Sequence, residues 1–320
     1  MCQPDVVSSA VSSPPVCVLG LGLIGGSLLR AAVATGRPAW GYNRSSQVVD
    51  AAVADGFDAS TDLTATLRRA AASDALVVIA VPMPAVGSIL EAVAEHAPEV
   101  ALTDVVSVKA QVAAAVAAHG LSRRFVGGHP MAGTAESGWS AGTAELFRDA
   151  VWVVTVDDGT DPEVWRQVAD LALDCGSVVV PAESAEHDAA VARVSHLPHL
   201  LAEALALSGA GGGDLALGLA AGSFRDGTRV AATAPALVDA MCEGNADALL
   251  VTLDETLDVL RVAREHLADG STSDLTRAGH AARARYEQRR REPISGTQPG
   301  DDGWITAFRE AGRRGGVWTR

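Results

Sequence analysis

The sequence predicts an α/β domain built on a parallel sheet, followed by an all-α domain. Short apolar runs alternate with helix-like segments over the first part of the chain, which is the pattern of a parallel sheet with helices on both faces. The runs are apolar throughout, as expected of strands that are buried on both sides. From Glu183 onward only helical periodicity remains, so the second domain is predicted to contain no sheet.

The first domain spans residues 16–182. It is preceded by a polar, Ser- and Pro-rich N-terminus, residues 1–15, which we expect to be disordered. The strand Val16 to Leu19 leads through a glycine-rich turn into a helix over Ser27 to Ala34. The other apolar runs that predict strands are Ala39 to Tyr42, Ala75 to Val81, Ala101 to Val106, Phe125 to Gly127, Val151 to Val156 and Val178 to Val180.

The helical domain spans residues 183–292. Its clearest helix runs from Asn245 to Leu267, and Gly270 supplies a stop signal. One stripe of this helix is apolar, and its members are Ala246, Leu250, Leu253, Leu257, Leu260 and Leu267. Such a stripe packs either inside its own chain or against a second copy, and the sequence leaves both arrangements open.

Residues 293–320 are predicted to form a flexible tail. Pro293 to Gly303 is rich in Pro, Gly and Asp, which is typical of a linker. A short helix is expected over Trp304 to Ala311, followed by a basic end.

Composition excludes several classes of partner. The net charge of −14 disfavours nucleic acid, because phosphate backbones bind cationic surfaces, although a few local Arg and His residues suffice to hold a small anion. No apolar run is long enough to span a membrane, and the N-terminus lacks the pattern of a signal peptide. The four cysteines show neither disulfide nor metal spacing, so we expect a cytoplasmic protein without a metal site. Lys109 is the only lysine, which we attribute to codon usage rather than to chemistry.

Gly20, Gly22 and Gly25 form a GxGxxG motif between the first strand and the following helix. In this context the first glycine permits a tight turn, the second lets the backbone approach a pyrophosphate, and the third allows the helix to pack on the sheet. The pyrophosphate then lies at the positive end of the helix. The sequence thus predicts a Rossmann-type domain that binds NAD or NADP. Further contacts with the cofactor are expected from Leu23, Ile24 and Val81.

The segment after the second strand bears on the choice between the two cofactors. An NAD enzyme usually places a carboxylate here to hold the ribose 2′-hydroxyl, but this chain has the neutral Asn43, followed by Arg44 and Ser45. A guanidinium beside hydroxyls suits a 2′-phosphate, so we expect NADP or the use of both cofactors. Alternatively, Arg44 is solvated, or stacks on the adenine while NAD binds.

A second polar group is predicted near the carboxyl ends of the strands, where open α/β sheets bind ligands. His129 follows the run Phe125 to Gly127, and Ser107 follows the run Ala101 to Val106. A Ser hydroxyl near a His can orient the imidazole and fix its tautomer, and the His can then act as a general base. Two structural alternatives remain: His129 stabilises a turn, and Ser107 caps the next helix.

At these segments the sequence resembles the prephenate dehydrogenase family. The stretches that carry the resemblance are GLGLIGGS at 20–27, SVK at 107–109, GGHPMAGT at 127–134, SHLPH at 195–199 and FRDGTR at 224–229. They follow the family's order and cover most of the chain from Val16 to about Leu267. The pair of GGHPMAGT and a later SHLPH is far more specific than a GxGxxG alone.

The resemblance implies that the chain oxidises and decarboxylates prephenate, or its transaminated form arogenate, with NAD(P). It implies that His129 is the catalytic His that bonds the C4 hydroxyl and that Ser107 assists it. His199 would contact the polar end of the substrate, and Arg229 would pair with a carboxylate. Further residues implied to surround the substrate are Thr134 and Asp226. In the family the helical domain forms a homodimer and can lend residues to the partner's site.

Other residues have structural interpretations or depart from the family's pattern. His196 is expected to be a buried, hydrogen-bonded His at a helix start, and Arg225 to form a structural ion pair with Asp226. Val106 stands where the family often has Gly, and Ala135 stands where many members have Glu. The stretch after residue 292 is too short for the regulatory amino-acid-binding domain of some members, so we expect none.

Two rival functions are weaker. A β-hydroxyacid or 6-phosphogluconate-type dehydrogenase also joins a Rossmann domain to a helical one, but such an enzyme typically uses a Lys in the helical domain, and this chain has none there. A nicotinamide-binding redox sensor would need no assembled polar site, whereas Ser107, His129 and Arg229 predict one.

Overall fold

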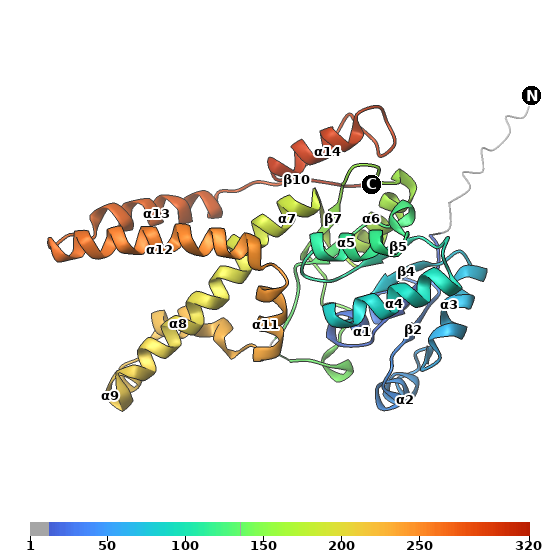
Figure 1. Ribbon diagram of the computed structural model, residues 1–320, viewed down its shortest axis with the longest axis horizontal. Helices are drawn as coiled ribbons and strands as arrows, with labels where there is room; N and C mark the ends of the chain where they lie inside the picture. Colours follow the sequence, from blue (N-terminus) through green and yellow to red (C-terminus); the bar gives the residue numbers. More distant parts are fainter. Residues whose placement is uncertain (1–12, 135) are drawn as a thin grey trace, which may run out of the picture.

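The structure is a computed structural model that describes residues 13–134 and 136–320. Figure 1 shows an α/β domain and a group of long helices that project away from it. The predicted order, a parallel-sheet domain followed by a helical one, is confirmed. The disorder predicted for residues 1–15 falls mostly on residues 1–12, which lie outside the described part of the chain.

A five-stranded parallel sheet forms the centre of the first domain. In spatial order its strands are β3 (Ala59–Ser60), β2 (Ala39–Tyr42), β1 (Val16–Leu19), β4 (Leu76–Ile79) and β5 (Leu102–Asp104). All neighbouring pairs are parallel. The chain order reverses between β1 and β4, which is where open α/β sheets bind ligands beyond the carboxyl ends of their strands.

Helices cover both faces of this sheet. They are α1 (Leu23–Ala34), α2 (Ser46–Ala54), α3 (Leu63–Ala72), α4 (Met83–His96) and α5 (Ala110–Ala118). Val16 and Val18 of β1 lie in one core with α1, while Cys17 and Leu19 lie in a second core with α3 and α4. This burial on both sides explains why the strands read as uninterrupted apolar runs.

A second, three-stranded sheet continues the first domain. Its elements are β6 (Gly128–Pro130), β7 (Val151–Thr155), α6 (Pro162–Asp174) and β8 (Val178–Ala182), with short 3-10 turns at η1 (Ser122–Arg124) and η2 (Trp139–Ala141). Strand β6 is antiparallel to β7, and β7 is parallel to β8. The expectation that all the apolar runs form parallel strands is therefore wrong for β6.

The strand predicted at Phe125 to Gly127 is also displaced. Only Phe125 bridges to Leu102 of β5, and the chain then crosses to β7 as Gly128–Pro130. A Cβ at Gly128 would lie 2.7 Å from the carbonyl oxygen of Asp104, so the crossing requires glycine. Apolar periodicity does not report such a close approach, and His129 consequently lies inside a strand rather than after one.

The helical domain begins with α7 (Ser184–Val191), the π-helical segment η3 (Ala192–His196) and α8 (Leu197–Gly211), which follow one another without a break. The remaining segments are α9 (Gly213–Gly218), α10 (Gly222–Thr228), η4 (Arg229–Ala232), α11 (Pro235–Glu243), α12 (Ala246–Ala268) and α13 (Ser273–Glu287). Helix α12 confirms the helix predicted from Asn245 to Leu267. Figure 1 shows α8 with α9, and α12 with α13, as two projecting arms. Among the described helices, none is both long and apolar enough to cross a membrane.

The prediction of a flexible tail at residues 293–320 is wrong. Strand β9 (Glu292–Pro293) pairs with β10 (Gly316–Val317), and α14 (Trp304–Arg313) lies between them in the chain. Figure 1 shows α14 above the first domain and the C-terminus beside that domain.

Aromatic side chains hold this tail in place. Trp304, Phe308 and Trp318 are buried and meet Trp165 of α6 edge to face, with ring centroids 5.0 to 6.1 Å apart. Aromatic residues bury large areas and favour such edge-to-face pairs. The Pro, Gly and Asp content indicated a linker, but these three side chains anchor the segment to the core.

Candidate active site

The glycine-rich turn after β1 has a geometry that only glycine allows. Gly20 adopts φ +110°, and a Cβ there would lie 2.5 Å from the carbonyl oxygen of Ala80. A Cβ on Gly25 would lie 1.9 Å from the carbonyl oxygen of Gly20, so α1 can approach the strand this closely only with glycine. These two residues therefore produce the tight turn and the close packing of α1 on the sheet.

Gly22 differs from these two because a Cβ there would meet nothing within 4 Å. The open space lies at the N-terminus of α1, whose first turn has no acidic side chain and no side-chain cap. Free N–H groups at a helix N-terminus attract anions, so a pyrophosphate fits this space. Leu23 and Ile24 form the half-buried first turn beside it, and Val81 borders Gly20 from the end of β4.

The segment after β2 places polar side chains beside the glycine-rich turn, because β2 pairs with β1 in the sheet. The side-chain oxygen of Asn43 accepts a hydrogen bond from the backbone N–H of Ser45 at 2.9 Å, which fixes the turn. Arg44 is exposed in this turn. Its guanidinium is therefore accessible to a phosphate, and no carboxylate stands where one would hold the ribose of NAD.

His129 belongs to a chain of hydrogen bonds. Its Nδ1 lies 2.8 Å from Nε2 of His187, and Nδ1 of His187 lies 2.8 Å from a carboxylate oxygen of Asp188. The two imidazoles are buried and meet edge to face, with ring centroids 5.0 Å apart. His187 and Asp188 both lie on α7, so the first helix of the second domain holds a side chain of the first domain.

This chain of bonds sets the tautomer of His129. An ionised carboxylate only accepts, so Nδ1 of His187 donates to Asp188 and Nε2 of His187 accepts. Nδ1 of His129 then donates, which leaves its Nε2 without a proton and able to accept one. Burial lowers the pKa of His129 well below its ordinary 6.5, and the neighbouring His187, Lys109 and His196 lower it further. At neutral pH His129 is therefore a neutral ring with a basic Nε2.

Asp188 also binds the start of α5. Its two carboxylate oxygens accept hydrogen bonds from the backbone N–H groups of Lys109 and Ala110, each at 2.8 Å. Burial alone would raise the pKa of Asp188, but the bonds from His187 and from these two N–H groups outweigh burial and lower the pKa. The carboxylate thus stays ionised, satisfies the N-terminus of α5 and ties that helix to α7.

Lys109 lies beside the same group. It is fully buried, and its Nζ forms an ion pair with Asp104 at the end of β5. Nζ also donates to the carbonyl oxygen of Gly128 at 2.7 Å, immediately before His129. A buried ammonium is stable only when it is paired and hydrogen-bonded, as here. The only lysine of the chain therefore has a structural role, and the attribution to codon usage alone is wrong.

Ser107 is half-buried in the turn between β5 and α5. The N-cap position of α5 is Lys109, so the alternative that Ser107 caps this helix is wrong, and Asp188 satisfies the helix instead. Nδ1 of His129 is likewise held by His187 rather than by Ser107. Within the described residues the hydroxyl of Ser107 has no hydrogen-bond partner that would compete with a ligand.

The π-helical segment η3 brings a third histidine to this group. His196 is fully buried, and burial lowers its pKa to about 4, with His187 and His199 adding to the decrease against Asp188. The side-chain amide of Asn245 donates to Nδ1 of His196 at 3.1 Å, so the proton of His196 lies on Nε2. This Nε2 is buried without a hydrogen-bond partner among the described residues. The expectation that His196 is buried and hydrogen-bonded is thus met at Nδ1, whereas Nε2 is a donor without a partner.

His199 and Arg229 lie next to each other. His199 is half-buried in the first turn of α8, and Arg229 is exposed at the start of η4. Burial lowers the pKa of His199, Glu203 opposes that change, and Arg229 adds to it. Nδ1 of His199 is buried without a partner among residues 13–134 and 136–320. Helix α8 continues directly from η3, so His199 follows His196 by three residues and extends the polar group around His129.

Two residues implied by the family motifs are exposed in the single chain and bond only near neighbours in the sequence among the described residues. Thr134 is exposed in the loop after β6, where its hydroxyl bonds the backbone of Glu136. Asp226 is exposed on α10 and pairs with Arg225 at 3.7 Å, as predicted for a structural ion pair. Ala135, the departure from the family pattern, lies outside the described residues.

Sequence reasoning missed His187 and Asp188. Their adjacency in α7, which places an imidazole beside a carboxylate, was the available signal. His187 is 58 residues from His129, however, and only the packing of α7 against β6 brings the two rings together. Local spacing therefore indicated Ser107 as the partner of His129 instead.

Comparison with known proteins places the chain in a family. The family models described as prephenate dehydrogenase, nucleotide-binding domain, and prephenate dehydrogenase, dimerization domain, match residues 30–181 and 183–278. A cyclohexadienyl dehydrogenase of Zymomonas mobilis is 33% identical over 260 residues, which cover 79% of this chain and 88% of that relative.

Solved structures agree with these matches. A Corynebacterium glutamicum protein proposed to be a prephenate dehydrogenase is 51% identical, with a TM-score of 0.89 over 96% of this chain and 99% of that one. The arogenate dehydrogenase of Synechocystis is 32% identical, with a TM-score of 0.72 over 85% of this chain and 99% of that one. The dinucleotide turn, the buried neutral His129 and these matches together show that the chain belongs to the prephenate dehydrogenase family of oxidoreductases.

Proposed function

We propose that this chain catalyses the NAD(P)-dependent oxidative decarboxylation of prephenate to 4-hydroxyphenylpyruvate, a step towards tyrosine. The observation that carries the proposal is the neutral His129, whose Nδ1 is held by His187. His129 follows Gly128, which contacts the end of β5. Strand β5 belongs to the same sheet as β4 and β1, and the turn at Gly20 follows β1 at the same edge of that sheet. A base and a dinucleotide turn at one edge are what removal of a hydride from an alcohol carbon requires.

In the proposed reaction Nε2 of His129 accepts the proton of the C4 hydroxyl of prephenate. The bound nicotinamide supplies the acceptor for the hydride that leaves C4. The ring carboxylate leaves as CO2, its bonding electrons make the ring aromatic, and the C4 oxygen takes the proton back from Nε2 of His129 to give the phenol. His187 and Asp188 stabilise the positive charge that His129 gains, because the carboxylate lies at the far end of the same chain of bonds.

The neighbouring side chains suit the polar groups of the substrate. We propose Arg229 and His199 as ligands of a prephenate carboxylate, because a guanidinium and an unpaired imidazole nitrogen lie together there. Ser107 would bond the C4 hydroxyl beside His129, and Nε2–H of His196 supplies a further buried donor. The residues whose role rests on family resemblance alone are Thr134 and Asp226.

The cofactor is proposed to be NADP or either of the two dinucleotides, held by the turn at Gly20, Gly22 and Gly25. Arg44 is exposed where a 2′-phosphate would lie, beside the bonded turn of Asn43 and Ser45. Arg44→Ser is expected to raise the KM for NADP by about tenfold or more and to change the KM for NAD little. An equal effect on the two cofactors would show that Arg44 does not read the phosphate.

The assay that tests the function follows absorbance of the reduced nicotinamide with purified protein. Prephenate and arogenate are offered separately, each with NAD and with NADP. Turnover of prephenate that falls by about 10²- to 10⁴-fold in His129→Ala supports the proposal. Turnover of arogenate but not of prephenate would support the same type of reaction with arogenate as the substrate. Absence of turnover with both would refute the proposal.

We also propose that the chain forms a homodimer through its helical domain. Leu250, Leu257 and Leu260 of α12 are about half exposed in the single chain, and Leu207 and Leu219 are exposed near the end of the other arm. A groove of about 350 Å³ lies between α12 and α13, and its apolar lining residues are Val259, Val262, Ala263, Leu275 and Ala278. Monomeric proteins rarely leave so much apolar surface exposed. Light scattering should give twice the chain mass, and Leu257→Glu with Leu260→Glu should give the single mass.

We also propose that the protein is located in the cytoplasm. Cys17, Cys175 and Cys242 are free thiols, as is usual in reducing compartments. Burial raises the pKa of Cys17 and of Cys175 to about 12, which keeps these thiols protonated and unreactive. Cell fractionation with an antibody to the chain tests the location.

A further inference from the structure

A cavity of about 990 Å³ lies where the end of α13 meets the first domain, and none of the residues around His129 lines it. Val151 of β7 and Val180 of β8 contribute to its lining, as does Gly315 after α14. Six of its lining side chains are guanidiniums: Arg285, Arg289, Arg290, Arg291, Arg313 and Arg314. No Asp or Glu belongs to the lining.

This concentration of positive charge is unusual in an acidic chain. The six arginines come from 25 Lys and Arg residues in a protein of net charge −14. Of these six arginines, only Arg313 and Arg314 have ion pairs within the described residues, with Glu186 at 2.7 Å and with Glu310 at 3.8 Å. Guanidiniums that line one cavity repel each other, and a bound anion lowers that repulsion.

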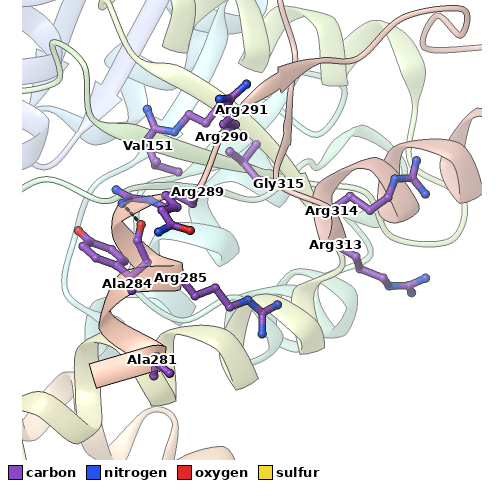
Figure 2. Close-up of a pocket in the computed structure, with 14 residues that line it drawn as sticks. Val151, Ala281, Ala284, Arg285, Arg289, Arg290, Arg291, Arg313, Arg314 and Gly315 are labelled. Atoms are coloured by element: carbon purple, nitrogen blue, oxygen red, sulfur yellow. Dashed lines mark hydrogen bonds between the residues drawn. The ribbon is translucent and has the colours of Figure 1, made fainter. Parts of the chain in front are cut away.

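Arginines border the cavity from two sides. Figure 2 shows Arg285 and Arg289 on one side of the opening, and Arg313 and Arg314 on the other. Arg289 is positioned by Tyr286, because its guanidinium lies 3.9 Å from the ring centroid and donates to the Tyr286 carbonyl oxygen at 2.7 Å. A planar guanidinium binds a phosphate or a carboxylate through two parallel hydrogen bonds. A ligand with several such groups would bridge the two sides.

We propose that this cavity binds a small polyanion with two or more phosphate or carboxylate groups. A concave space of this volume suits a small molecule, whereas a nucleic acid needs an extended basic surface on a protein of favourable charge. The ligand joins α13 of the helical domain to β7 and α14. Strand β7 pairs with β6, with Val153 opposite His129, so the ligand contacts the sheet that carries this histidine.

Titration calorimetry on the purified full-length chain tests the site. The probes are inorganic tripolyphosphate and citrate, each added at constant ionic strength, so that the preferred anion chemistry is read directly. The variant R285Q/R290Q/R291Q removes three arginines that have no ion pair among the described residues. The control R68Q/R123Q/R148Q removes the same charge from exposed positions of the first domain. At least one probe is expected to bind once per chain, about 100-fold more weakly in the first variant and unchanged in the control.

Four outcomes would overturn the proposal. Neither probe binds, or both variants weaken binding equally, which indicates only overall charge. Alternatively, the first variant binds the probe as well as the unmodified chain does, which places the anion elsewhere, such as the turn at Gly22. If acidic side chains of a second copy fill the cavity, the first variant changes the oligomeric mass and no probe binds. These readouts need no substrate, so they are independent of the reaction proposed above.

Discussion

An isolated imidazole carries its proton on either ring nitrogen, and Asp188 removes that choice for two histidines at once. The carboxylate accepts from His187, which must then accept from His129. The same carboxylate is kept ionised by two backbone N–H groups of α5. The tautomer of the candidate base is therefore set through a carboxylate that the N-terminus of α5 holds ionised.

His187 offers a direct test of this arrangement. His187→Leu should lower kcat by about 10²-fold or more with little change in KM, because His129 loses the acceptor that fixes its tautomer. His187→Gln keeps an acceptor of similar size and should recover part of the rate. Stopped-flow or steady-state rates from pH 5 to 9 measure both variants. If Leu and Gln at this position gave equal rates, His187 would only fill space.

At the scale of elements, the π-helical segment explains how one continuous helical stretch presents several histidines to one site. His187 and His196 are nine residues apart, and in a regular α-helix such residues point to roughly opposite sides. The wider turn of η3 changes the rotation between them, and π segments are frequent at functional sites. A periodicity of 3.6 cannot anticipate this change, so the sequence indicated His199 from its motif and left His196 as packing.

The C-terminal element carries a prediction of its own. Phe308→Ala should lower the free energy of unfolding by roughly 3–5 kcal/mol, because Phe308 is fully buried among Trp165, Trp304 and Trp318. Thr306→Ala, on the exposed side of the same helix, is the control and should be nearly neutral. Urea unfolding followed by Trp fluorescence measures both. If Phe308→Ala left the free energy of unfolding unchanged, the C-terminal segment would be loosely attached, as the sequence predicted.

For the molecule as a whole, the sequence predicts what local patterns determine. The order of domains and the long helix α12 follow from periodicity, and the geometry at Gly20 and Gly25 follows from a motif with a steric cause. The features that the sequence does not predict depend on contacts between residues that are far apart in the chain. The antiparallel β6, the contact of His129 with His187 and the anchored tail all arise where segments far apart in the chain meet.

The buried histidines should make the stability of the whole molecule depend on pH. His129 and His196 have folded pKa values below the ordinary 6.5, so the unfolded chain binds more protons than the folded chain as pH falls below about 6.5. Stability is therefore full above that pH and is lost progressively towards pH 4, the value to which the pKa of His196 falls.

His196→Asn should flatten this dependence, since Asn does not titrate. Urea midpoints at pH 7.5, 6 and 5 measure the slope for the variant and for the unmodified chain. His280→Asn, on the exposed face of α13, is the control and should leave the slope unchanged. Equal slopes in all three proteins would show that His196 is not protonated on unfolding in this range.

The buried Lys109 has one more consequence, because it is the only side-chain amine of the chain. An amine-reactive ester can acylate it only when the contact with Asp104 opens and Nζ meets solvent. The mass of the peptide that contains this residue, followed over time, would therefore report how often the buried site around Lys109 opens to solvent. The rate of labelling thus measures how fast the contact of Nζ with Asp104 and with the Gly128 carbonyl oxygen opens to solvent.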